Sequence, residues 1–292
     1  MAADCLVVKR NLGPSKCNIM PGLIKGIITA NRDFKFTAVN SVLGAQWQAK
    51  LLDTPANRLH LFPRFDDFKE SSEKDVYKQT DLSTQFVRFG RYEFDITIIK
   101  SLYQHKAMQS HSGNATPKAY LVDVANRIWG YADSTGNFVP YDVELLQAGK
   151  MDFNTGKDPS SSPLKVVLSD ATQLNVNGAY VDAQSFFNSL LELVDVDIAE
   201  VGVLAGTTLK LTVKVSSDGT SVDGLGGGAG FPDFKIASAA GVARVITAVA
   251  QDAAGVYTLT VTALAVGDIV NLTTPALLSI PGYESTGQFI AA

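Results

Sequence analysis

Few residues of this 292-residue chain could support catalysis. Asp123 and Glu144 form the acidic pair that could act as a general acid and a general base. Each lies in a stretch typical of a strand with basic residues nearby, so we interpret both as surface ionic residues. The sequence contains no G-x-S-x-G, H-E-x-x-H, C-x-x-C or D-x-D-x-D-G run. We therefore expect no catalytic residues and no enzyme.

Residues that bind metals are equally sparse. His105 and His111 flank the segment 101–109, but neither has a carboxylate at metal-site spacing, so we expect solvated or capping histidines. Cys5 and Cys17 are the two cysteines of the chain, twelve positions apart. We interpret them as small apolar side chains, with a disulfide formed after release from a cell as the alternative. The sequence predicts no metal site and no cofactor.

The segment from Gly224 to Gly230 is the one glycine-rich run. A phosphate-binding loop requires a strand before it, a helix after it and usually a lysine at its end. Here Phe231, Pro232 and Asp233 follow, and they do not favour a helix. The pattern predicts a flexible loop between strands.

Charge and composition change near Val194. From Leu190 onward there are four basic and ten acidic residues, and every His, Cys and Trp lies before Val194. The net charge of −4 gives no electrostatic reason to expect binding to nucleic acid. No apolar run reaches the roughly 18 residues that span a bilayer, and the start does not read as a signal peptide, so we expect folding in the cytosol.

The elements that would position these residues differ between the two parts of the chain. Residues 1–194 show the mixture of strands and helices typical of an α+β body, with a charged solvated loop at 65–78 and an exposed loop at 152–163. The expected strands are 23–29, 34–39, 58–63, 86–99 (a hairpin, or one strand with a bulge at Gly90), 119–124, 127–131, 138–146 and 165–168. The expected helices are 42–52 capped by Ser41, 101–109, and a helix from Asp182 or Ser185 to about Val194.

Residues 195–292 alternate with the period of a β-sandwich. Strands are expected at 208–215, 243–248, 255–262 and 268–272, at spacings near 12 residues with Gly- and Asp-containing turns between them. Tyr257 lies at the start of its strand, where immunoglobulin-like domains often place an aromatic residue. We therefore expect two domains, a mainly β body over 1–194 with two or three helices and an Ig-like sandwich over 195–292.

The order of these features resembles a known family. A helix precedes an R-x-x-x-F/L-P strand at 58–63, a charged stretch and an aromatic alternating strand at 86–98; a V-D-x-x-x-x-I-W-G turn at 122–130 and a Leu-Ser-Asp at 168–170 follow. This arrangement resembles structural virion proteins of tailed bacteriophages, most closely tail tube (major tail) proteins, some of which carry a C-terminal Ig-like domain. The motifs are short, and no fixed binding residues come with them.

The resemblance implies a homo-oligomer in the virion, made in the host bacterial cytoplasm. Such subunits form rings, usually hexameric, that stack into a hollow tube through which DNA passes as cargo, beside other virion proteins and without a membrane. By this resemblance, the loop 65–78 and the N-terminal arm would make the ring-to-ring contacts. Strands around 86–98 and 119–146 would build the inter-subunit sheet. The Ig-like domain would sit outside.

Two alternatives remain open at this stage. One is another phage component: a capsid decoration protein, a head–tail connector or a baseplate protein. The other is a cell-surface or carbohydrate-binding adhesin, although Phe231, Phe234 and Tyr257 offer little for sugar stacking.

Overall fold

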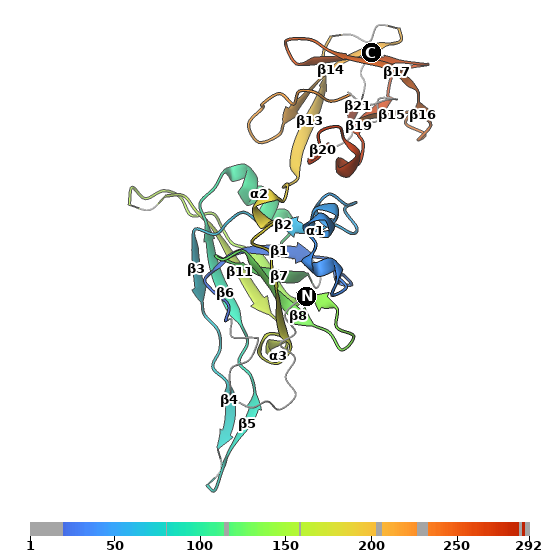
Figure 1. The fold of residues 1–292 in the computed structure, drawn as a ribbon. Coiled ribbons are helices and arrows are strands. Elements are labelled where there is room, and N and C mark those ends of the chain that lie inside the picture. Colours follow the sequence, from blue (N-terminus) through green and yellow to red (C-terminus); the bar gives the residue numbers. More distant parts are fainter. Residues whose placement is uncertain are drawn as a thin grey trace. The chain divides into compact units, whose positions relative to one another are not determined.

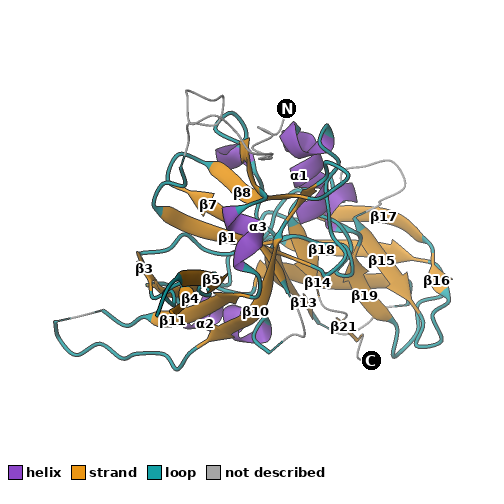
Figure 2. Cartoon of the chain, turned by 90° about the horizontal axis from the view of Figure 1, so that it is seen from below, coloured by secondary structure: helices purple, strands orange, loops and turns teal. Residues whose placement is uncertain are grey.

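The computed structural model describes residues 20–79, 81–113, 117–157, 159–202, 206–226, 233–285 and 288–289; Cys5, Cys17 and the N-terminal arm lie outside them. Within these residues the protein is mainly β with three short α-helices, which confirms the predicted fold class (Figure 2). The chain divides into two compact units, residues 1–50 with 55–190 (unit 1) and 51–54 with 191–292 (unit 2). The helices are α1 (Gly44–Leu51), α2 (Leu102–Ser110) and α3 (Ala171–Asn175).

Unit 1 is built around one antiparallel sheet of ten strands, which curls into half a barrel (Figure 1). The main path runs β12-β8-β7-β10-β11-β6-β3, while β1 pairs with β7 and β2, and β9 pairs with β8. The strands are β1 (Ile24–Ala30), β2 (His60–Leu61), β3 (Asp67–Glu70), β6 (Glu93–Ile98), β7 (Lys118–Asp123), β8 (Arg127–Ala132), β9 (Phe138–Val139), β10 (Tyr141–Ala148), β11 (Ser162–Leu168) and β12 (Gly178–Asp182).

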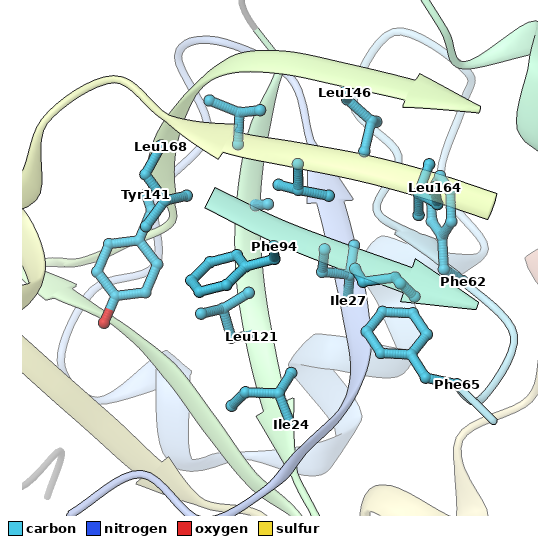
Figure 3. Close-up of a cluster of buried hydrophobic side chains, with 14 of the residues drawn as sticks. Ile24, Ile27, Phe62, Phe65, Phe94, Leu121, Tyr141, Leu146, Leu164 and Leu168 are labelled. Atoms are coloured by element: carbon cyan, nitrogen blue, oxygen red, sulfur yellow. The ribbon is translucent and has the colours of Figure 1, made fainter. Parts of the chain in front are cut away.

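The core of unit 1 follows from the alternation of its strands. Side chains two apart point to the same face of a strand, so Phe94, Ile96 and Ile98 of β6 are all buried. They pack with inward residues of β1, β7, β10 and β11 in a single cluster (Figure 3). Trp47 of α1 packs elsewhere in the unit, with its ring 5.2 Å from that of Tyr120 on β7.

A separate two-stranded sheet extends beyond the ten-stranded one. Among the described residues, strands β4 (Val76–Gln79) and β5 (Thr84–Arg88) pair only with each other. They continue the excursion that begins with β3 and returns through β6 (Figure 1). We call this element the β4–β5 ribbon.

Unit 2 is a sandwich with the strand order of an immunoglobulin-like domain. One sheet has the order β17-β18-β14-β13-β20 and the other β16-β15-β19-β21. Taking β13, β14, β17 and β18 as strands A, B, D and E, and β15, β19 and β21 as C, F and G, reproduces the two Ig sheets. The strands are β13 (Val194–Glu200), β14 (Thr208–Val215), β15 (Phe234–Ala237), β16 (Ala243–Arg244), β17 (Ile246–Gln251), β18 (Val256–Val261), β19 (Ile269–Leu272), β20 (Tyr283–Ser285) and β21 (Gln288–Phe289).

The structure corrects several sequence predictions, three of them between residues 34 and 78. Residues 34–39 make one isolated bridge, Phe36 to Phe138, because the chain bends directly into a 3-10 turn at Asn40–Val42. Ser41 lies inside that turn, where its Oγ donates to Ala38 O at 3.0 Å, so it is not a helix N-cap. The segment 65–78 is not a loop: it contains β3 and β4, because both strands find partners in the returning chain.

The helix expected from Asp182 or Ser185 to Val194 is also absent. Only a 3-10 turn, Phe187–Ser189, forms there, and β13 begins at Val194. The apolar residues at 194, 196 and 198 alternate with Asp195 and Asp197, a period that suits a strand and not a helix.

Candidate assembly surface

Asp123 and Glu144 have different environments in the structure and make different contacts. Asp123 is fully buried at the end of β7. Its Oδ1 accepts from the N–H groups of Ala125 (2.9 Å) and Arg127 (3.0 Å), and its Oδ2 accepts from Trp129 Nε1 at 3.0 Å. The interpretation of Asp123 as a surface ionic residue is therefore wrong, because the turn and the indole satisfy it internally. Glu144 is exposed and binds Arg91 at 2.9 Å.

The two candidate histidines have structural environments. His105 is buried with Nδ1 2.9 Å from Ser162 Oγ, so it is neither solvated nor a cap; Ser101 caps α2 instead. His111 occupies the C-cap of α2, and its ring lies 4.6 Å from that of His60. Burial lowers the pKa of His111. Within the described part of the chain, no group of three or more His, Cys, Asp or Glu could hold a metal ion.

The described part of the glycine-rich segment is occupied by the protein's own acceptors. Gly224 N donates to Gln251 Oε1 at 2.9 Å, and Leu225 N donates to Tyr257 Oη at 3.2 Å. Gly226 N donates to the carboxylate of Asp233. A carboxylate facing the loop disfavours phosphate, so residues 224–226 do not form a phosphate cradle. Residues 227–230 lie outside the described part.

The aromatic residues considered for sugar stacking belong to the core of unit 2. Phe234 and Tyr257 are buried with ring centroids 5.4 Å apart, and Tyr257 Oη donates to Val222 O at 2.6 Å. Phe231 lies outside the described residues. Neither described ring is available to a ligand.

The β4–β5 ribbon is the most unusual surface of unit 1. All nine residues of its two strands are exposed, yet several are apolar. Tyr77 is 57% exposed, Leu82 99%, Phe86 49% and Val87 55%; we call these four the ribbon cluster. Tyr77 and Phe86 face each other across the strands with ring centroids 5.7 Å apart. Exposed apolar side chains gathered on one element mark an interaction site.

At the base of the ribbon, the two arms of the chain are joined to each other. Gly90 N donates to Asp75 Oδ1 at 2.9 Å, and Glu73 N donates to Arg91 O at 3.0 Å. The two chains cross so closely at this point that a Cβ on Gly90 would lie 2.0 Å from Glu73 O. Arg88 and Glu73 form an ion pair at 3.5 Å. These contacts hold the two arms together where the ribbon begins.

The strands expected to build an inter-subunit sheet have neighbours within this chain. β6 lies between β11 and β3, β8 between β12 and β7, and β10 between β7 and β11. The ends of the main sheet path are β12 and β3, so an intermolecular sheet would extend from those edges.

No helix in the described ranges is long and apolar enough to cross a membrane. A scan of the chain against known protein families and a search of curated proteins both find no match.

Proposed function

We propose that the protein is a non-enzymatic structural subunit of a tailed-bacteriophage particle. In this proposal it self-assembles into stacked rings that form a tail tube, with DNA as the passing cargo. The observation that carries the proposal is the β4–β5 ribbon, whose apolar side chains lie outside both hydrophobic cores of the described residues. A two-stranded hairpin of this kind is marginally stable alone in water. A neighbouring subunit that covers the ribbon cluster supplies the missing burial.

The architecture of the two units supports a separate role for each. Unit 1 carries the ribbon and the two ends of an antiparallel sheet, and both are means by which subunits join. Unit 2 completes a sandwich core of its own, with Tyr257, Leu259 and Val213 fully buried. We assign assembly to unit 1 and an outward position to unit 2.

Electron microscopy of the purified full chain tests the proposal. We expect stacked rings or tubes from the wild-type protein and from a control variant, Val242→Ser with Val245→Ser, which replaces two exposed apolar residues of unit 2. The matched ribbon variant, Tyr77→Ser with Phe86→Ser, should remain monomeric. A wild-type chain that stays monomeric at high concentration contradicts the proposal, as does a ribbon variant that assembles like the wild type.

A further inference from the structure

Lys25 of β1 is aimed out of its strand by a β-bulge. Ile24 pairs with Asp123 and Gly26 pairs with Val122. The two partners on β7 are adjacent in the sequence, whereas the two residues on β1 have one residue between them. Lys25 is that residue. A bulge re-aims the side chain that it carries, and bulges recur beside reactive sites.

Asn126 meets Lys25 from an unusual backbone conformation. It lies in the turn between β7 and β8 with φ 58°, one of two described non-glycine residues with positive φ. Asp123 holds this turn: its backbone O accepts from Asn126 N at 3.0 Å, and its Oδ1 accepts from the N–H groups on both sides of Asn126. Asn tolerates the left-handed region better than most residues, so the turn presents the Asn126 carboxamide at low cost.

The two side chains are in direct contact. Lys25 Nζ donates a hydrogen bond to Asn126 Oδ1. The other end of the carboxamide is fixed as well, because Asn126 Nδ2 lies 3.4 Å from Asn188 Oδ1 as a donor. The ring of Phe187 lies beside the amine, with its centroid 5.3 Å from Nζ. This arrangement places a primary amine in contact with the carbonyl oxygen of an oriented carboxamide.

Burial and a neighbouring cation act together on the pKa of Lys25. Burial lowers the pKa of Lys25, and the positive charge of Arg64 lowers it further, against an opposing effect of Asp123. Desolvation and a neighbouring cation are the two means by which proteins activate a lysine nucleophile. Fixed proximity replaces the encounter that two free groups would need.

We infer that Lys25 and Asn126 join in an intramolecular isopeptide bond. The neutral amine of Lys25 attacks Cγ of Asn126, a bond forms between Nζ and Cγ, and the bond between Cγ and Nδ2 breaks. One hydrogen of the amine passes to Nδ2, which leaves as ammonia, and the other remains on Nζ as the amide hydrogen. The reaction needs no oxidant, metal or second substrate.

The bond links the start of β1 covalently to the β7–β8 turn. These elements are neighbours in the sheet but lie 101 positions apart in the sequence. A crosslink that closes so long a loop restricts the unfolded chain strongly. It would strengthen unit 1 whether or not the subunit assembles, so this inference stands apart from the proposed function.

Intact mass spectrometry and a tryptic map of the full-length protein test the bond. Trypsin does not cleave after an amidated lysine, so we expect residues 17–32 to persist as one peptide joined to residues 119–127. The wild-type protein and the control Lys35→Arg should be lighter than their sequences by one ammonia, whereas Lys25→Arg and Asn126→Ala should have their full masses.

Two results overturn the inference. One is a wild-type protein with the full mass of its sequence. The other is a loss of ammonia with residues 17–25 and 119–127 recovered as separate peptides, which indicates a cyclic imide at Asn126 and an unmodified Lys25.

Discussion

The long hairpin that runs from β3 to β6 buries its apolar side chains at the end near the sheet and exposes them at the far end, in the β4–β5 ribbon. Near the sheet, β6 buries Phe94, Ile96 and Ile98 in the core of unit 1, and Phe94 is only 4% exposed. Farther out, β5 leaves Phe86 and Val87 about half exposed, although the chain is the same continuous excursion. The difference shows that apolar residues in the ribbon contribute little to the stability of the subunit. The proposed assembly accounts for their place in the molecule by contact with another copy.

The largest effect should come from the buried end. Phe94→Ala is expected to lower the free energy of unfolding of unit 1 by about 3–5 kcal/mol, because it removes transfer energy and leaves a cavity. Both tryptophans, Trp47 and Trp129, lie in unit 1, so urea unfolding followed by tryptophan fluorescence reports this unit alone. A loss below about 1 kcal/mol would show that β6 is not anchored in the core as described.

The matched substitution at the exposed end should separate stability from assembly. Phe86→Ala is expected to change the free energy of unfolding by less than about 0.5 kcal/mol, as exposed positions do. It should weaken association between subunits by about 2–4 kcal/mol, because a large aromatic residue at an interface often dominates binding. Sedimentation velocity over a concentration series measures the association. Equal association of the variant and the wild type would remove Phe86 from the interface.

The base of the ribbon, at Gly90, can be altered without changing the buried residues of β6 or the ribbon cluster. Gly90→Ala places a methyl group against Glu73 O, where the structure leaves no room, and should cost about 1–3 kcal/mol. Gly22→Ala is the control, because the nearest atom to its added Cβ is 3.6 Å away. We expect the junction variant to lose order in the ribbon first, seen as new protease cleavage between β4 and β5. Cleavage that begins elsewhere would mean that Gly90 does not fix the ribbon.

The smallest effect concerns the ion pair on the outer face of the buried end. Lys165 of β11 binds Glu93 at 2.9 Å, and the hydrogen bond and charge of Glu93 raise the pKa of Lys165 above 10.5. A raised pKa contributes stability below pH 10.5 that is lost as the pH rises through the folded value. Lys165→Gln should therefore be slightly less stable than the wild type at neutral pH, and the difference should vanish at higher pH. Urea midpoints at both pH values check the sign, and a difference that grows with pH contradicts it.

Strands with strict alternation were the part of the fold that sequence predicted best. The segment 208–215 matches β14, and 255–262 contains β18, because in each an apolar side chain at every second position faces a core. Failures came where tertiary contacts decide the conformation. Phe34 and Phe36 alternate like a strand, but one bridge to Phe138 is all the pairing available to them. Strand β13 was missed because Phe186, Leu190 and Leu193, spaced four and three residues apart, favoured a helix that reached Val194.

The ribbon could be recognised only in part from the sequence. The turn formers between Gln79 and Phe86 mark a hairpin, yet the charged neighbours of Tyr77 favoured a solvated loop. The sequence does not show that both faces of the ribbon are exposed, because an isolated hairpin and a hairpin at the edge of a packed sheet have the same sequence pattern. The contact of Lys25 with Asn126 was equally hidden, because it depends on a bulge and a left-handed turn 101 positions apart.

Hydrogen exchange of the ribbon amides tests the central claim most directly. Amides of residues 76–79 and 84–88 should exchange rapidly in the isolated subunit, because a solvent-exposed hairpin opens easily. In the assembled protein the same amides should be strongly protected, while those of unit 2 keep the rates they had before assembly. Equal exchange of the ribbon in both states would contradict the account, because the ribbon would then not be covered by a second copy.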